Sequence, residues 1–287
     1  MLQASFAFSI MAFCVKLASR TLPSFEIVFF RSFIGMVMIL ILIRLKRVSL
    51  WGMDHKIMMA RGLSGFAALA LFFYTIGRLP LGTAMLLNYT APIFVALFAV
   101  TFLDEHVNKT LFGLILLAFA GVYLLVSDQT AVVIASQDKT AFGIGLLSAV
   151  FAAIAYVLIR KIQHNESPLT VIFYFTAIST VGSLFLLPFS GFRWPDPVTW
   201  GLLLVVGVSA YFGQVWLTIA LRRTRASIVT CFSYFAPLLA FLYGFLFFGE
   251  KISWRGIAGA GLIVLAGCLI SYSGTKLRGE SAAAETD

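Results

Sequence analysis

The residues of this sequence that are best suited to chemistry are polar groups beside prolines, inside two strongly apolar stretches. Asn88-Tyr89-Thr90-Ala91-Pro92 recurs 145 residues later as Ser233-Tyr234-Phe235-Ala236-Pro237. A proline inside a helix has no N–H to bond four residues back, so each proline frees the carbonyl of the first residue of its motif. Freed carbonyls are costly in hydrocarbon unless protein, water or a ligand satisfies them. Both kinks are therefore predicted to face a wet, solute-binding cavity, and a proline that merely bends its helix is the alternative.

Residue sets for covalent catalysis or metal binding are not evident in the sequence. It has neither a Gly-x-Ser-x-Gly elbow nor paired histidines on one helix face. Its three histidines lie at predicted cytoplasmic helix ends, too far apart for a local metal motif: His55, His106 and His164. Its three cysteines stand alone in apolar segments, as small packing residues do. The sequence therefore predicts no enzyme, no metal and no cofactor.

Composition and hydropathy predict an integral membrane protein. Of 287 residues, 61% are hydrophobic and only 11% are charged, whereas soluble domains have about 25% charged residues. A helix needs roughly 20 residues to cross a bilayer core. The apolar residues fall into ten blocks of about this length, which predict an all-α fold of ten transmembrane helices: 2–20, 24–44, 57–78, 81–103, 109–127, 141–161, 169–189, 198–221, 225–248 and 254–273.

The blocks divide into two repeats of five helices, residues 1–127 and 141–273, followed by a polar tail at 274–287 that is predicted to be disordered and cytoplasmic. Because five is odd, the second repeat must enter the membrane from the opposite side, so the repeats are inverted. In secondary transporters such repeats place a binding site near the midplane and expose it alternately to each side. This arrangement favours transport, although inverted repeats also line channels.

Basic residues predict the orientation, since cytoplasmic loops hold the excess positive charge. With both termini cytoplasmic, thirteen Lys and Arg, including Arg61, lie at predicted inner ends and six at outer ends. This bias indicates a multi-pass protein of the bacterial inner membrane. The net charge of +9 is scattered over short loops, and a nucleic-acid-binding surface would gather it on one face. The predicted partners are a small-molecule substrate and the lipid bilayer, not nucleic acid.

The sequence resembles the EamA-type branch of the drug/metabolite transporter superfamily over essentially its whole length. The resemblance is in the five-plus-five pattern, the Ala-Pro pairs about a dozen residues before Glu105 and Glu250, and the glycine-containing helices 113–121 and 259–267. It implies a secondary transporter of small organic solutes, most similar in pattern to bacterial exporters of aromatic and other amino acids. Organic cations and drugs, nucleosides and organic acids are the alternative substrates.

The resemblance also implies which helices surround the cavity: the kinked fourth and ninth with the first, third, sixth and eighth, while the fifth and tenth lie peripherally. Carried onto this sequence, it gives these cavity candidates: Lys16, Tyr74, Asn88, Tyr89, Tyr156, Tyr211, Gln214, Trp216, Ser233 and Tyr234. Each aromatic residue has a role in the interfacial belt as an alternative. For Gln214 the alternative is an interhelical hydrogen bond, worth about 0.6 to 2 kcal/mol.

Two cations fall inside predicted helices, where a charge at the bilayer centre costs at least about 2.5–3.5 kcal/mol. Lys16 is predicted to snorkel to the outer surface, and Arg31 to form a structural ion pair with Glu26. If either faced the cavity, it would favour a substrate carboxylate. Acidic residues are absent from the helix centres, so facilitated movement is as compatible with the sequence as proton antiport.

Small residues in the last block permit close helix contact: Gly256, Gly259, Ala260, Gly261 and Gly267. Such contact serves either packing within one chain or a homodimer, and the sequence does not separate the two. A monomer is equally compatible with it.

Overall fold

The computed structural model describes residues 1–79, 81–103, 109–135, 139–162, 166–248, 254–266 and 269. Within these ranges the regular structure is helical, without a strand. The predicted tail at 274–287 lies outside the described residues, as do His106, His164, Glu105, Glu250 and Gly267. The helices are α1 (Leu2–Ala18), α2 (Ser24–Lys46), α3 (His55–Arg78), α4 (Leu81–Asn88), α5 (Ala91–Leu103), α6 (Lys109–Ala135), α7 (Lys139–Lys161), α8 (Pro168–Ser190), α9 (Pro197–Arg223), α10 (Ala226–Cys231), the 3-10 turn η1 (Phe232–Tyr234) and α11 (Phe235–Phe248). The helix Trp254–Ala266 follows.

Many of these helices have the length and apolarity of membrane spans. Among the described residues, six are long and apolar enough to cross a bilayer: Ser24–Lys46, His55–Arg78, Ala84–Leu103, Thr140–Lys161, Pro168–Pro188 and Pro197–Arg223. Four shorter apolar helices accompany them: Leu2–Ala18, Lys109–Leu124, Ile228–Leu239 and Trp254–Ala266. The protein is thus a helical membrane protein, and the count of ten spans in inverted repeats stays a prediction.

Two of the apolar segments are interrupted just before their prolines. Segment 81–103 is divided into α4 and α5 by a turn at Tyr89 and Thr90, directly before Ala91-Pro92. Segment 226–248 is divided into α10 and α11 by the 3-10 turn η1, which ends three residues before Pro237. Proline removes a helical hydrogen bond and clashes with the preceding turn, which explains both interruptions. The two helix breaks put non-helical backbone inside the bundle.

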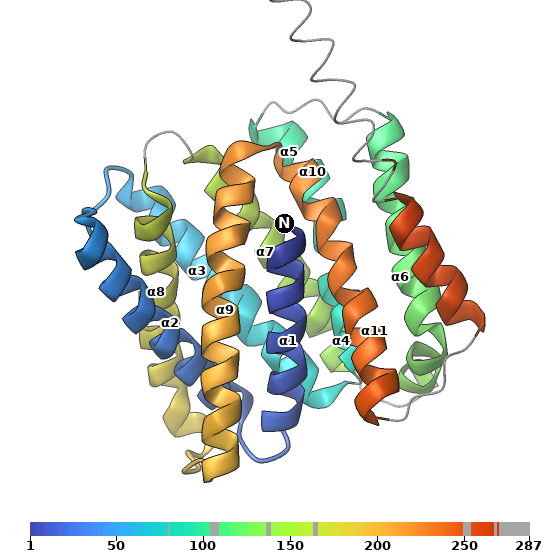
Figure 1. Ribbon diagram of the computed structural model, residues 1–287, viewed down its shortest axis with the longest axis horizontal. Helices are drawn as coiled ribbons and strands as arrows, with labels where there is room; N and C mark the ends of the chain where they lie inside the picture. Colours follow the sequence, from blue (N-terminus) through green and yellow to red (C-terminus); the bar gives the residue numbers. More distant parts are fainter. Residues whose placement is uncertain are drawn as a thin grey trace, which may run out of the picture.

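The helices pack as a bundle in which segments distant in sequence are neighbours (Figure 1). α1 packs against α9, α2 against α8, and α3 against both α7 and α8. α6 and the helix Trp254–Ala266 lie side by side at one flank, away from α2 and α8 (Figure 1). The main cluster of buried apolar side chains draws mostly on α1, α2, α3, α4 and α9, and it extends to α6 and the helix Trp254–Ala266.

The flank is closed by a glycine contact between α6 and the helix Trp254–Ala266. A Cβ at Gly121 would lie 2.8 Å from the carbonyl oxygen of Gly259 and 2.9 Å from a side-chain carbon of Ile263. Only a residue without a side chain permits this approach. At Gly259, the small-residue face noted in the sequence therefore packs within the chain.

Gly121→Leu is expected to lower the thermal unfolding midpoint of the purified protein, because overpacking a close contact costs about 1–3 kcal/mol. The matched control is Gly113→Leu in the same helix, where an added Cβ meets nothing within 4 Å. Equal midpoints for the two variants, measured in one detergent, would show that the contact does not contribute to stability.

At one end of the bundle, the α2–α3 loop is tied to the start of α8. The Glu166 carboxylate accepts hydrogen bonds from the backbone N–H groups of Met53 (2.5 Å) and Asp54 (2.6 Å), at the N-terminus of α3. The Thr170 hydroxyl donates to the carbonyl of Ser49 (2.8 Å). A carboxylate at a helix N-terminus is favoured by the helix dipole. We call this group, Ser49, Met53, Asp54, Glu166 and Thr170, the loop clasp.

At the opposite end, polar groups fix the starts of α2 and α9. Glu26 accepts a hydrogen bond from the backbone N–H of Arg193 (3.1 Å). Asp196 caps α9 by accepting from the backbone N–H of Thr199 (3.2 Å). Hydrogen bonds from Thr199 to the carboxylate lower the pKa of Asp196 below its usual value. Both ends of the bundle are thus held by carboxylates on backbone N–H groups.

Candidate functional site

A cavity of about 100 Å³ lies in the middle of the bundle, between the two helix breaks. α1, α2, α3, α4, α5, α7, α8, α9 and η1 contribute to its wall, whereas the described side chains of α6 and of the helix Trp254–Ala266 are not among its lining residues. The wall is formed by Met1, Ser5, Phe8, Met11, Arg31, Arg61, Gly65, Ala68, Leu69, Phe72, Asn88, Tyr89, Ala91, Pro92, Ala152, Ala155, Tyr156, Phe175, Gln214 and Ser233.

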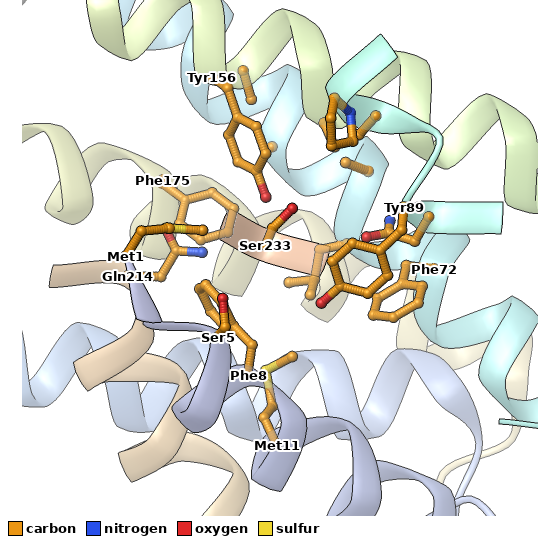
Figure 2. A pocket seen from close by; sticks show the side chains of 18 of the residues that line it. Met1, Ser5, Phe8, Met11, Phe72, Tyr89, Tyr156, Phe175, Gln214 and Ser233 are labelled. Atoms are coloured by element: carbon orange, nitrogen blue, oxygen red, sulfur yellow. The ribbon is translucent and has the colours of Figure 1, made fainter. Parts of the chain in front are cut away.

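Half of the predicted cavity residues are among them: Asn88, Tyr89, Tyr156, Gln214 and Ser233. Figure 2 shows the hydroxyl groups of Tyr89, from the turn between α4 and α5, and of Tyr156, from α7, directed toward the space around Ser233. The Asn88 amide donates to the Ser148 hydroxyl (3.3 Å), which attaches the end of α4 to α7. Tyrosine, serine and amide groups therefore meet where the helices are broken, and they can donate or accept hydrogen bonds to a solute.

Two other candidates from the sequence lie at the ends of helices. Lys16 donates from Nζ to the carbonyls of Ile76 and Leu79, each at 2.8 Å, and so caps the end of α3. A cation at a helix C-terminus satisfies carbonyls that have no helical partner. The ring of Tyr74 packs against the guanidinium of Arg78, whose central carbon lies 5.5 Å from the ring centroid. Neither residue lines the cavity.

The three remaining candidates pack against other side chains. Tyr211 packs in a separate apolar cluster beside α2 and α8. Trp216 stacks on Phe212 (5.5 Å) in an apolar groove between α1 and α9. Tyr234 is 1% exposed, and its ring centroid lies 6.2 Å from that of Tyr89. Other residues of α9 and η1 line the cavity, but these three side chains do not.

Two arginines line the cavity although the sequence predicted other positions for them. Arg31 and Arg61 both line the cavity and are only 3% and 1% exposed. The predicted ion pair of Arg31 with Glu26 is not formed, because Glu26 lies at the end of the bundle and accepts from the backbone of Arg193. Arg61 was predicted at a cytoplasmic helix end, but it lies inside α3 and is buried. Both corrections follow from helix packing that brings α2 and α3 against α8.

The two guanidinium groups share one aromatic ring. The guanidinium carbons of Arg31 and Arg61 lie 5.2 and 4.5 Å from the ring centroid of Phe175. Arg61 also donates from Nη2 to Gln214 Oε1 (3.4 Å). Cation–π contacts are worth about 0.5–2 kcal/mol, which is less than the cost of a charge within a bilayer. The ring therefore offsets only part of the cost of burying these charges.

Several donors of this pair have no acceptor. Arg31 Nε, Arg61 Nε and Arg61 Nη1 are buried without a hydrogen-bond partner in the described part of the chain. None of the described residues that form the cavity wall is Asp or Glu. This wall thus has two positively charged side chains and no acidic one, and the field within the cavity favours anions.

A signal for Arg61 does exist in the sequence. Arg61, Gly65, Ala68, Leu69 and Phe72 recur at helical spacing and form one stripe of α3 along the cavity. The family resemblance implied that this helix lines the cavity, although Arg61 itself was predicted at its cytoplasmic end. Phe175 gives no comparable signal, since it is one of 29 phenylalanines.

A helical membrane bundle with a cavity at two broken helices, where hydrogen-bonding groups lie among apolar side chains, is typical of a membrane transporter. Across the described residues, no group of three or more His, Cys, Asp or Glu is placed to hold a metal ion. The EamA-like transporter family matches residues 1–127 and 140–272. The chain belongs to this family of small-solute transporters.

Relatives of known name are transporters. The chain is 38% identical to the pseudopaline exporter CntI of Pseudomonas aeruginosa, over 95% of this chain and 94% of that protein. It is 24% identical to the S-adenosylmethionine uptake transporter of Rickettsia prowazekii, over 91% of this chain and 87% of that one. A solved crystal structure at 17% identity superposes with a TM-score of 0.81, covering 96% of both chains, and shares the fold.

Proposed function

We propose that this protein is a secondary transporter of the bacterial inner membrane that exports small organic solutes, amino acids including aromatic ones foremost, by alternating access through the central cavity. The observation that carries the proposal is the position of the cavity at both helix breaks, where Tyr89 and Ser233 line it. In secondary transporters the substrate site lies at discontinuous helices. Inverted five-helix repeats and cytoplasmic termini belong to the same proposal.

Export of a pseudopaline-like solute is the second candidate function. It is favoured by the identity of 38% to the pseudopaline exporter along 95% of this chain. Export of organic cations is disfavoured, because Arg31 and Arg61 line the cavity without an opposing carboxylate. Two fixed positive charges repel a cation at close range.

Counterflow in proteoliposomes tests the proposed function. Purified protein is reconstituted in vesicles preloaded with one unlabelled solute, and uptake of the labelled solute is followed with and without a pH gradient. The panel holds amino acids, nucleosides, organic acids and organic cations. A carrier accelerates uptake of the labelled form of its own substrate, whereas a pore does not. Movement of cations alone, or equal uptake from empty and preloaded vesicles, would overturn the proposal.

Gln214→Leu is expected to reduce counterflow about 5- to 10-fold, because it removes a cavity amide that accepts from Arg61. The same replacement at Gln3, which is exposed on α1, is the control. Initial rates are compared at equal amounts of reconstituted protein, with size-exclusion profiles to verify folding. Wild-type rates for Gln214→Leu would remove this amide from the transport site.

A further inference from the structure

We propose that Arg31, Arg61 and Phe175 form a binding site for a small organic solute that carries two carboxylate groups. The inference deepens the proposed transport function and rests on it, since the site lies in the same cavity. It goes beyond that function by assigning the charge of the substrate: among amino acids and organic acids, it selects those with two carboxylates over the aromatic amino acids.

The charge of the solute follows from what surrounds the two guanidinium groups. They are the only charged side chains among the described residues that form the wall. The carboxylates of Glu26 and Glu166 are engaged by backbone N–H groups at opposite ends of the bundle. Two fixed cations without a counter-charge are neutralised by two negative charges, and a dianionic solute supplies both in one molecule.

Hydrogen bonding selects carboxylates as the source of these charges. A guanidinium presents its donors in a planar fork that matches the two oxygens of a carboxylate. Arg31 Nε, Arg61 Nε and Arg61 Nη1 are buried and unpaired. The ring of Phe175, which contacts both groups, limits their rotation. Arg61 thus has two unpaired donors and Arg31 has one, on two guanidinium groups beside the same ring.

The size of the cavity favours a small solute. Its volume is about 100 Å³, which is below the range of about 300–1,000 Å³ for pockets that hold drug-sized ligands. A short dicarboxylate, or an amino acid with an acidic side chain, fits these limits better than a large conjugate. Tyr156 and Gln214 then provide hydrogen bonds to the rest of the solute.

Ligand-induced thermal stabilisation of the full chain in lipid nanodiscs tests the site. The probes are glutarate and glutamate, each compared with its amide counterpart, glutaramide or glutamine, and with chloride at equal ionic strength. We expect titratable stabilisation by the two dicarboxylates, and at least about 10-fold weaker binding by the amides. Arg31→Gln and Arg61→Gln are each expected to weaken dicarboxylate binding at least about 10-fold. Arg78→Gln, at an exposed position of α3, is expected to leave it unchanged.

A second readout separates a binding role from a structural one. Arg31→Met removes an unpaired buried charge while keeping an unbranched apolar stem of similar length. We expect this variant to unfold at a higher temperature than the wild type without ligand, and to lose the stabilisation by glutarate. If Arg31 served the fold, the variant would instead unfold at a lower temperature, and the proposal would be overturned.

The outcomes also distinguish this site from the proposed function. Counterflow of neutral or cationic solutes that is unaffected by Arg31→Gln and Arg61→Gln would overturn the dicarboxylate site and leave the transporter intact. Carboxylate-dependent stabilisation with no counterflow of any solute would support the site and overturn the transport function. Equal stabilisation by chloride and glutarate would show an unspecific anion site and reject the assignment to dicarboxylates.

Discussion

Gly65→Ala is expected to reduce transport by up to about 100-fold while the protein still folds. Gly65 lines the cavity, and a Cβ there would lie 2.2 Å from Arg61 Nη1 and 2.8 Å from the ring of Phe175. The Arg61 guanidinium is the end of a flexible side chain, so we expect it to give way and to leave its position over the ring. Overpacking of this kind costs about 1–3 kcal/mol, which corresponds to about 5- to 150-fold in an equilibrium constant.

Gly143→Ala is the control for this variant, since an added Cβ at Gly143 in α7 meets nothing within 4 Å. Both changes raise intrinsic helix propensity in the same way, so a difference between them reports the contact with Arg61. Counterflow of the best substrate is measured in parallel with the thermal unfolding midpoint. Wild-type transport by Gly65→Ala would show that the position of the guanidinium does not affect the solute.

Glu166→Gln is expected to destabilise the protein by about 3 kcal/mol. The carboxylate accepts from two backbone N–H groups in the loop clasp, and Glu166 is 6% exposed. Hydrogen bonds to a charged group contribute about 1.5–3 kcal/mol each. The glutamine side chain keeps an oxygen acceptor but loses the negative charge at the N-terminus of α3. Its NH₂ group is a donor and cannot accept from a backbone N–H. The thermal unfolding midpoint should fall clearly below that of the wild type.

Asp54→Asn is the control, because it removes the same negative charge from another residue of the loop clasp. The side chain of Asp54 forms no capping hydrogen bond at the start of α3, so this variant should unfold close to the wild-type temperature. Equal losses of stability in both variants would mean that the net charge of the loop matters and the two hydrogen bonds do not.

Much of the fold could be predicted because its signals are local. Apolar blocks of bilayer length and a proline within a block are properties of a few adjacent residues, and the structure interrupts the helices before Pro92 and Pro237. The same holds for Asn88 and Ser233, which lie at the breaks and line the cavity. In these cases the residues that determine the structure are neighbours in the sequence.

The rest of the site could not be predicted because it depends on which helices pack together and how each is rotated. Trp216 and Gln214 are two residues apart on α9, yet one faces an outer groove and the other the cavity. Arg31 meets Arg61 only through Phe175 of α8, more than 100 residues away in the sequence. A single sequence holds no record of such pairings, so the paired cations could be seen only in three dimensions.

The flank formed by α6 and the helix Trp254–Ala266 has a practical consequence. Its helices meet through the contact of Gly121 with Gly259, and none of their described side chains lines the cavity. Position 113, which is open on α6, is therefore suited to carry a dye or to anchor a rigid fusion partner for imaging. A reporter placed there would follow the protein through its cycle without altering the chemistry that recognises the cargo.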